Sequence, residues 1–258
     1  ENKNLVIGCG LSGAVIARLL AENGEKVLII DKKNHIAGNI YDYTDENGIC
    51  IHKYGSHIFH TNSEKVWAFI RRFADLNTYM HKVIAVIDGI ETTIPFNINT
   101  LYDVFPKSLA MRLEQKLLNN FDYNSKVPIL EFQKQNDEDL KFLAERVPVY
   151  ISKDNRYFQD KYQGIPLGGY TKMVENILNH PDIEVKLNTA YNKDYSNFKR
   201  IFCTGSIDEF FDYKFGQLPY RSVNFKFETH NCEFYQSNAV VNYPCNYDFT
   251  RIHEYKYY

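Results

Sequence analysis

The pattern of apolar and polar positions in the first thirty residues predicts a strand, a helix and a second strand. Residues 4–8 form an apolar run of strand length, and residues 26–31 form a second run that ends in an acid. Asn23-Gly24 is typical of a helix end. Helical spacing is shared by five apolar residues between the runs: Ala14, Val15, Ala17, Leu19 and Leu20. These patterns together predict a strand–helix–strand unit.

Beyond this unit, helical and strand-like patterns occur in blocks. Residues 100–145 carry apolar residues at helical spacing among charges, as in SLAMRLEQKLLNNF and NDEDLKFLAE. Residues 171–212 return to the first unit, with a helix in TKMVENILNH and strands in IEVKLNT and RIFCTG. The other segments alternate Tyr, Phe, Val and Ile with polar residues, as in SVNFKFETH. This alternation predicts an antiparallel sheet.

A glycine pattern lies between the first strand and the helix. Gly8, Gly10 and Gly13 form G-x-G-x-x-G, and Asp31 follows the last glycine by eighteen residues. In this context the first glycine permits a tight turn, the second lets backbone amides approach a pyrophosphate, and the third lets helix and strand pack closely. The acid accepts ribose hydroxyls, and the pyrophosphate lies at the helix N-terminus. The sequence therefore predicts a dinucleotide site, with a ligand-free glycine turn as the less favoured reading.

The residues after Asp31 favour FAD over NAD. The sequence KKNHIAGNIYDY brings a basic pair and then Ala37-Gly38-Asn39. This order resembles FAD-binding proteins with a glutathione-reductase-like fold, in which an acid, a spacer and a small-residue pair lead the chain along the cofactor. Ala37 departs from the usual pair of glycines. In NAD enzymes the second strand usually runs on into the next helix, so the resemblance implies FAD.

Composition excludes several other classes of protein. The chain of 258 residues has 30 Lys and Arg against 32 Asp and Glu, so it lacks the excess of positive charge typical of nucleic-acid binders. Its five cysteines are scattered without a CxxC pair, which fits reduced thiols in the cytoplasm. No apolar run approaches the roughly eighteen residues of a membrane span. We therefore expect a cytoplasmic protein with no nucleic-acid partner and no membrane span.

Later segments resemble one enzyme family over essentially the whole chain. They are GICIHKYGSHIFHTN, IPFNINT, RVPV, RYFQDKYQGIPLGGYTKM, CTGSIDEFFDYKFG, LPYRSVNF and TRIHEYKYY. Their order and register are similar to those of bacterial UDP-galactopyranose mutases. The resemblance implies an isomerase that interconverts UDP-galactopyranose and UDP-galactofuranose for cell-surface glycans, with no net redox change. It also implies reduced FAD, an external reductant that primes the flavin, and a homodimer.

The resemblance carries a mechanism and site residues with it. In the family, N5 of reduced flavin attacks the anomeric carbon and releases UDP, and an iminium, ring-opened intermediate then recloses. Arg146 in RVPV and Arg251 in TRIHEYKYY match arginines that bind the diphosphate, as catalytic and substrate-binding residues. Tyr157, Asn242 and His81 match further substrate-binding positions. The implied cofactor-binding residues are Gly8, Gly10, Leu11, Ser12, Gly13, Asp31, Lys32, Gly38, Asn39, His57, Ile58, Thr204 and Gly205.

Three histidines, His52, His57 and His60, lie close together in HKYGSHIFHT. A metal site is the first hypothesis, but the spacing shows no carboxylate or thiolate partner nearby. We therefore expect no metal. The resemblance implies instead that this segment passes the flavin ring and that His60 is a catalytic residue beside the reacting side. Whether His60 moves a proton or shapes the flavin wall stays open, and His52 reads as an ordinary strand residue.

We expect a mixed α/β fold, with a Rossmann-like FAD-binding domain, an inserted helical domain and an antiparallel β-sheet domain. The expected limits are 1–78 and 171–217 for the FAD-binding domain and 99–146 for the helical domain. The sheet domain, which holds substrate, is expected in 79–98, 147–170 and 218–258.

Two departures from the family pattern leave alternatives open. DLKFLAE runs straight into RVPV where family members have an aromatic segment with a tryptophan, and the only tryptophan here is Trp67. Family members also continue beyond the position of Tyr258, so we expect a truncated or incomplete chain. The alternatives are an amine-oxidase-like FAD oxidoreductase on the same scaffold and an inactive nucleotide-sugar-binding fragment.

Overall fold

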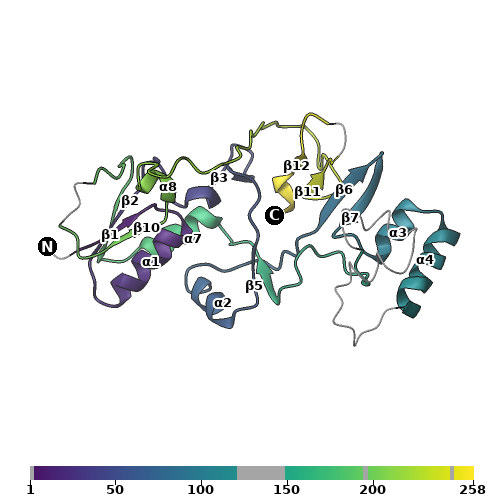
Figure 1. Cartoon of the computed structure of the whole chain (residues 1–258), viewed down its shortest axis with the longest axis horizontal. Coiled ribbons are helices and arrows are strands. Elements are labelled where there is room, and N and C mark those ends of the chain that lie inside the picture. The colour runs from purple at the N-terminus through teal and green to yellow at the C-terminus, as the bar shows by residue number, and fades with distance from the viewer. Residues whose placement is uncertain (1–2, 121–148, 194–196, 245–246) are drawn as a thin grey trace. The chain divides into compact units, whose positions relative to one another are not determined.

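The computed structural model describes residues 3–120, 149–193, 197–244 and 247–258 (Figure 1). The chain folds into two compact units that interleave along the sequence. Unit 1 comprises Glu1–Tyr79 and Gly164–Thr229, and unit 2 comprises Met80–Gln163 and His230–Tyr258. The three-domain division expected from the sequence remains a prediction.

Unit 1 is built on a parallel sheet with strand order β10-β1-β2-β9. Its central strands are buried on both faces because they consist almost entirely of apolar residues. Helices α1 and α7 pack against each other. The bounds are β1 Asn4–Ile7, α1 Leu11–Glu22, β2 Val27–Ile30, α7 Tyr170–Leu178, β9 Ile183–Lys186 and β10 Ile201–Cys203. The strand–helix–strand start, the helix in TKMVENILNH and the strands in IEVKLNT and RIFCTG are therefore confirmed.

Glu25 ties the strand ends of this sheet together. Its carboxylate accepts hydrogen bonds from Asn4, Lys199 and Arg200 at 2.6–3.0 Å. These contacts lower the pKa of Glu25 to about 2. The three donors belong to β1 and to the segment that leads into β10, so the contact fixes the edge at which these strands enter the sheet.

The rest of unit 1 consists of short elements around this sheet. Strands β3 (Asp42–Thr44) and β4 (Cys50–His52) form an antiparallel pair. Helix α2 begins after Ser63, whose hydroxyl accepts the Val66 N–H at 3.3 Å. The other bounds are η1 Gly38–Ile40, β5 Phe59–Thr61, α2 Glu64–Ile70 and α8 Ile207–Phe210, and β8, Tyr162–Gly164, spans the unit boundary.

Unit 2 contains a second sheet, with strand order β12-β11-β6-β7. Strands β6 (Val83–Ile87) and β7 (Ile90–Ile94) form a hairpin. Its turn residues, Asp88 and Gly89, both have positive φ, as a tight hairpin turn requires. Strand β11 (Val240–Asn242) pairs antiparallel with β12 (Arg251–His253) but parallel with β6. The sheet is thus mixed and not purely antiparallel as expected, because no hairpin turn connects β6 to β11.

Two helices pack beside this sheet and form a small core of their own. Helix α3 (Ile98–Val104) is capped by Asn97, whose side chain accepts the Asn99 N–H at 2.8 Å. Helix α4 spans Lys107–Asn120, as its periodicity predicts, and η2 spans Tyr255–Tyr257. The core residues are Leu101, Ala110, Leu113, Leu117 and Val149. The second predicted helix of this region, in NDEDLKFLAE, lies outside the described residues.

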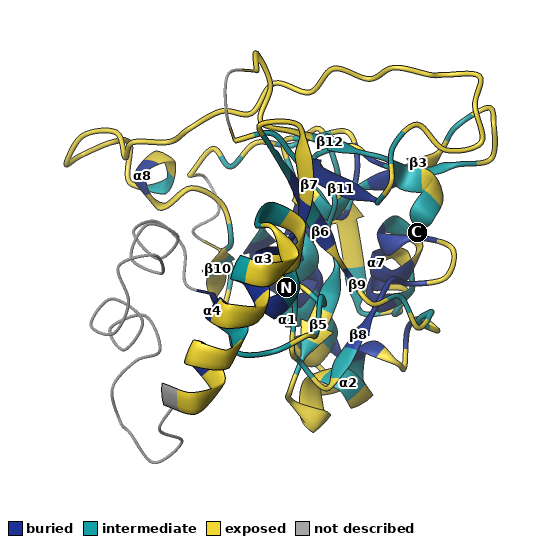
Figure 2. Ribbon diagram, turned by 90° about the vertical axis from the view of Figure 1, so that its right-hand side faces the viewer, coloured by how far each residue is buried: buried dark blue, intermediate teal, exposed yellow. Residues whose placement is uncertain are grey.

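The strand expected in SVNFKFETH does not form. Residues 216–230 contain neither helix nor strand, and Figure 2 shows this part of the chain largely as exposed coil. Val223 and Phe227 are 69% and 52% exposed. Alternation gives a strand only where a neighbouring strand supplies hydrogen bonds, and none of the described strands pairs with this segment. In the described ranges no helix combines the length and apolar character that crossing a bilayer demands.

Candidate functional site

The glycine-rich turn forms a narrow cradle at the N-terminus of α1. Gly8 has φ +101°, and a Cβ on Gly13 would lie 1.9 Å from the carbonyl oxygen of Gly8. Gly10 precedes the helix and has no side chain to cap it, and the first turn carries no acidic residue. The backbone N–H groups at this helix end are therefore available to an anion, and the helix dipole favours one.

Asp31 holds the end of β2 to this turn. One of its carboxylate oxygens accepts the N–H of Cys9 at 2.7 Å, and the other accepts the N–H of Lys33 at 2.8 Å. Burial, with Asp31 adding to it, raises the pKa of the Cys9 thiol to about 12, so the thiol stays protonated. A carboxylate has about four acceptor positions, so Asp31 retains capacity for ligand hydroxyls.

A second loop closes on the first. The N–H of Ala37 donates to the carbonyl oxygen of Cys9 at 2.8 Å, and Ala37 takes the left-handed conformation with φ 69°. A Cβ on Gly38 would lie 2.9 Å from the Cα of Gly10. Asn39 is exposed beside it, and Leu11 and Ser12 open α1 on the other side. The glycine-rich turn and the loop with Gly38 thus approach each other so closely that side chains would fill the space between them. This cradle of backbone fits a dinucleotide.

Two predicted cofactor residues, Thr204 and Lys32, use their side chains within the protein. The Thr204 hydroxyl donates to the carbonyl oxygen of Ile7 at 3.0 Å, and a Cβ on Gly8 would lie 2.4 Å from that hydroxyl. Lys32 donates to both carboxylate oxygens of Glu209 at 2.9 Å, an ion pair that raises its pKa. Gly205 faces open space. Thr204 thus supports the glycine-rich turn from behind.

The histidine-rich segment combines one buried and one exposed histidine with a half-buried one. His52 is 1% exposed, and its Nδ1 accepts the N–H of His57 at 3.2 Å. Burial lowers the pKa of His52 to about 4, with His57 adding to the effect and Asp42 opposing it. His57 lies 2.8 Å from the Gly55 carbonyl oxygen through its Nδ1, and it is followed by half-buried Ile58. His60 is exposed on β5, so its imidazole is the most exposed of the three.

The sequence pattern missed two neighbours of His52. Asp42 and Cys50 bring ligand-type atoms within 4.8 Å of it. The Asp42 carboxylate, however, accepts the N–H groups of Tyr170 and Thr171 at 2.6 and 2.8 Å. Both of its oxygens therefore cap α7, which gives the cluster a structural role.

In unit 2, two predicted substrate residues lie opposite each other. Arg251 on β12 pairs in register with Asn242 on β11, and Asn242 pairs in turn with Ala85 on β6. Directly opposite residues share one face of a sheet. The side-chain oxygen of Asn242 is buried and has no hydrogen-bond partner among the described residues, whereas Arg251 is exposed. The register thus sets these two residues on one face of the sheet, with the cationic one exposed.

A second pair of predicted substrate residues also lies together in unit 2. The N–H of Tyr157 donates to the His81 carbonyl oxygen at 2.8 Å, and their ring centroids are 5.8 Å apart. Gln163, which the sequence pattern did not single out, holds the neighbouring turn by donating to the carbonyl oxygens of Phe158 and Asp160 at 2.9 and 3.0 Å. Arg146 lies outside the described residues.

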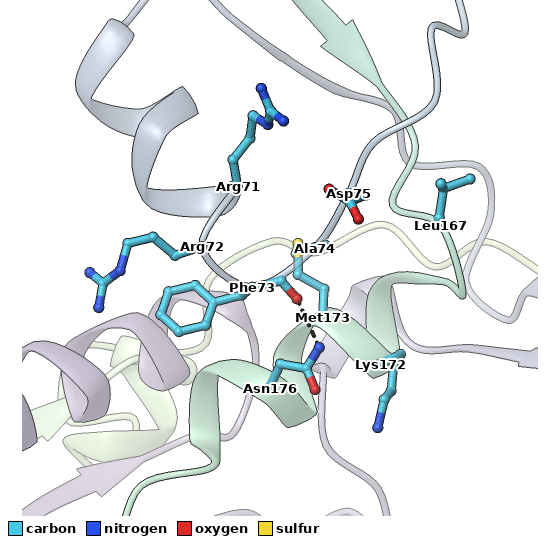
Figure 3. Close-up of a pocket in the computed structure, with 9 residues that line it drawn as sticks. All are labelled: Arg71, Arg72, Phe73, Ala74, Asp75, Leu167, Lys172, Met173 and Asn176. Atoms are coloured by element: carbon cyan, nitrogen blue, oxygen red, sulfur yellow. Dashed lines mark hydrogen bonds between the residues drawn. The ribbon is translucent and has the colours of Figure 1, made fainter.

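A surface hollow of about 330 Å³ in unit 1 is lined by none of the predicted site residues. Its polar contact joins the Asn176 side chain to the Phe73 carbonyl oxygen at 2.8 Å. Arg71, Arg72 and Lys172 rim the hollow, but their charged ends diverge (Figure 3). The hollow therefore does not gather their charge into an anion site.

Comparison with known proteins agrees with this geometry. The model of the family "UDP-galactopyranose mutase" matches residues 121–258, and that of the "NAD(P)-binding Rossmann-like domain" matches residues 6–73. The chain is 36% identical to a dTDP-fucopyranose mutase of Escherichia coli, covering 100% of this chain and 77% of that protein. It is 34% identical to a probable UDP-galactopyranose mutase of Klebsiella pneumoniae, covering 100% and 74%.

Among solved structures, a reduced UDP-galactopyranose mutase matches with 18% identity and a TM-score of 0.47, covering 72% of this chain and 49% of that one. The chain thus spans about half the length of that structure and about three quarters of the two sequence relatives. The family model covers more than half of the chain, and the identities extend over all of it. The chain, a mixed α/β protein with a Rossmann-like dinucleotide-binding region, belongs to the UDP-galactopyranose mutase family of isomerases.

Proposed function

We propose that the protein interconverts UDP-galactopyranose and UDP-galactofuranose. The register of Arg251 with Asn242 carries this proposal, because it sets an exposed cation and a second polar side chain on one face of the same sheet. A guanidinium binds phosphate oxygens in pairs and stabilises the charge that develops as a diphosphate leaves. An amine-oxidase-like enzyme has little use for such a group.

The proposed cofactor is FAD in its reduced form, primed by an external reductant. The backbone N–H groups after Gly10 would hold the pyrophosphate, and Asp31 the ribose, with Gly38 and Asn39 along the cofactor. Reduced flavin supplies the nucleophile that holds the sugar while its ring opens. The segment from His57 to His60 would shape the flavin end, with the exposed His60 imidazole on the reacting side.

The protein's own residues bind and orient the substrate in this proposal. Arg251 would hold the diphosphate, together with Arg146. Tyr157 would contact the diphosphate through its phenol ring, which is 43% exposed. Asn242 would accept a hydrogen bond near the uridine, and His81 would approach the sugar. We further propose a cytoplasmic homodimer that supplies UDP-galactofuranose for surface glycans.

The experiment is a product assay with the purified protein, FAD and dithionite. Chromatography should show UDP-galactopyranose formed from UDP-galactofuranose, with no stoichiometric oxygen uptake. Because one relative is a dTDP-fucopyranose mutase, the same assay should include the dTDP-fucose isomers. Turnover of the dTDP sugars alone would change the proposed substrate from a UDP-sugar to a dTDP-sugar. Oxygen consumption with turnover would support the oxidoreductase. No product from any sugar would support a binding fragment.

Replacing Arg251 with Ala should lower turnover about 100-fold or more, while FAD stays bound. The matched control is Arg71→Ala, since Arg71 is also exposed and is none of the residues assigned to the cofactor or the substrate. We expect the control to retain turnover within about twofold. An Arg251→Ala rate near that of the wild type contradicts the assigned role.

A further inference from the structure

His35 is buried at the foot of the second cofactor loop, and the proposed function gives it no role. Its side chain makes a contact at each ring nitrogen. Nδ1 lies 2.8 Å from the Ile36 carbonyl oxygen, and Nε2 lies 2.9 Å from the Tyr54 hydroxyl. The ring also stacks on Tyr41, with centroids 4.0 Å apart.

These partners determine the tautomer of the neutral imidazole. A carbonyl oxygen only accepts hydrogen bonds, so Nδ1 must carry the proton that it donates to Ile36. Nε2 then accepts from the Tyr54 hydroxyl, which can donate. Both nitrogens are therefore committed, and the stack on Tyr41 fixes the plane of the ring.

The contact with Ile36 acts on one particular peptide group. The carbonyl oxygen of the Ile36–Ala37 peptide accepts from His35, and its N–H donates to the Cys9 carbonyl oxygen. This one peptide is therefore held at both ends, between the imidazole and the glycine-rich turn. The residue that follows it, Ala37, is in the left-handed conformation that a side chain disfavours.

The anchors of the imidazole come from outside the loop. Tyr41 follows η1, and its carbonyl oxygen accepts the N–H of Lys53 at 3.1 Å. Tyr54 follows β4, and the ammonium groups of Lys33 and Lys53 lie 4.7 and 5.6 Å from its ring centroid. The ring is thus held by residues next to the β3–β4 pair, which lie outside the Ile36–Ala37 peptide itself.

We propose that His35 is a positioning residue for the dinucleotide, which holds the Ile36–Ala37 peptide so that Gly38 stays against Gly10. The inference rests on the proposed FAD site, because it assigns the loop a ligand. Without the imidazole, Ala37 relaxes from its positive φ, and Gly38 leaves the N-terminus of α1.

The test is a titration of the apoprotein with FAD, in which the quenching of flavin fluorescence measures binding. His35→Leu should raise the FAD dissociation constant about tenfold or more, the change expected when a buried hydrogen-bond pair is lost. Tyr54→Phe removes only the hydroxyl, so it should fold and give a smaller increase in the same direction. His180→Leu is the matched control, a half-buried histidine of unit 1 outside the loop, and should bind FAD as the wild type does.

Rescue separates positioning from a general loss of stability. Ala37→Gly removes the disfavoured φ, so the double variant His35→Leu/Ala37→Gly should recover much of the lost affinity. Hydrogen exchange at the Ala37 amide should also speed up in His35→Leu and Tyr54→Phe, with no FAD present. FAD affinity unchanged in both variants overturns the proposal, as does equal loss with and without Ala37→Gly. If the wild-type protein binds no FAD, the proposed cofactor is wrong. If hydrogen exchange at the Ala37 amide is unchanged in His35→Leu, the proposed role of His35 is wrong, whatever the cofactor.

Discussion

At the scale of single residues, polar side chains in unit 1 hold backbone in place before any ligand is considered. Asp31 accepts from Cys9 and Lys33, and the Thr204 hydroxyl donates behind Gly8. These contacts fix the backbone of the glycine-rich turn from the end of β2, for Asp31, and from the residue after β10, for Thr204. A mutation at Thr204 would therefore disturb the cofactor indirectly, through the path of the turn.

His52 gives a prediction about pH. Its pKa falls from 6.5 in the unfolded chain to about 4 in the fold, so only the unfolded state takes up a proton between these values. The free energy of unfolding should therefore decrease as the pH drops from about 6.5 towards 4, by about 3 kcal/mol for this group. Above pH 6.5 both states are neutral and the contribution is constant.

The measurement is urea unfolding at several pH values from 7 to 4.5, for wild type and His52→Asn. Asn keeps an acceptor near the position of Nδ1, which binds the His57 N–H, but does not titrate. The difference between the two curves should grow as the pH falls. Parallel curves would show that His52 titrates alike in both states.

At the scale of elements, β3 and α7 are joined although about 130 residues separate them. Asp42 accepts two N–H groups at the start of α7, while the Thr171 hydroxyl donates to the Asp42 carbonyl oxygen and accepts its N–H. Gly169 is required beside them, because a Cβ there would lie 2.8 Å from the carboxylate. The first turn of α7 is thus capped by a residue of another element.

Replacing Asp42 with Ala should destabilise the protein by about 2 kcal/mol, since two N–H groups of a buried helix end lose a charged acceptor. Asp42→Asn keeps one acceptor oxygen and should cost about half as much. Chemical denaturation followed by circular dichroism measures both. A cost below about 0.5 kcal/mol for Asp42→Ala would mean that water replaces the carboxylate.

The elements that the sequence predicted correctly are those with local causes. The strand–helix–strand start needs only two apolar runs, the glycine turn and the helical spacing from Ala14 onward. The parallel pairing of β6 with β11, the cap from Asp42 and the approach of Cys50 to His52 all depend on segments far apart in the chain. No local pattern encodes such pairings, and the same reason explains the missing strand in SVNFKFETH.

Of the predicted site residues, the structure joins Arg251 with Asn242 and Tyr157 with His81, while their roles remain predictions.

At the scale of the whole molecule, large apolar side chains gather on one exposed stretch of unit 1. Between Ile207 and Phe227, eight of them besides Tyr213 are at least 39% exposed: Ile207, Phe211, Phe215, Leu218, Tyr220, Val223, Phe225 and Phe227. Scattered surface apolar residues are ordinary, but so many within twenty-one residues of sequence favour association with other apolar surfaces. The net charge of −2 provides little repulsion against it.

Replacing Phe215 and Val223 together with Ser should therefore reduce binding of the dye ANS. The free energy of unfolding should change by no more than about 0.5 kcal/mol for each residue, because the side chains are 93% and 69% exposed. Leu113→Ala is the contrasting variant, since Leu113 is fully buried and its truncation should cost about 2–5 kcal/mol. Unchanged dye binding in the double Ser variant would place the dye elsewhere.

The interleaving of the two units has a consequence for the nascent chain. Strand β1 acquires its neighbour β10 only after residue 203 has been made, and β6 acquires β11 only after residue 242. At about 5–20 residues per second, translation separates β1 from β10 by roughly 10–40 s. Both sheets thus wait with an open edge on the ribosome, and the long loops they must close make folding slow. A chaperone that shields strand edges should therefore raise the yield of folded protein. The increase should be larger for this chain than for a protein whose sheets consist of hairpins between consecutive strands.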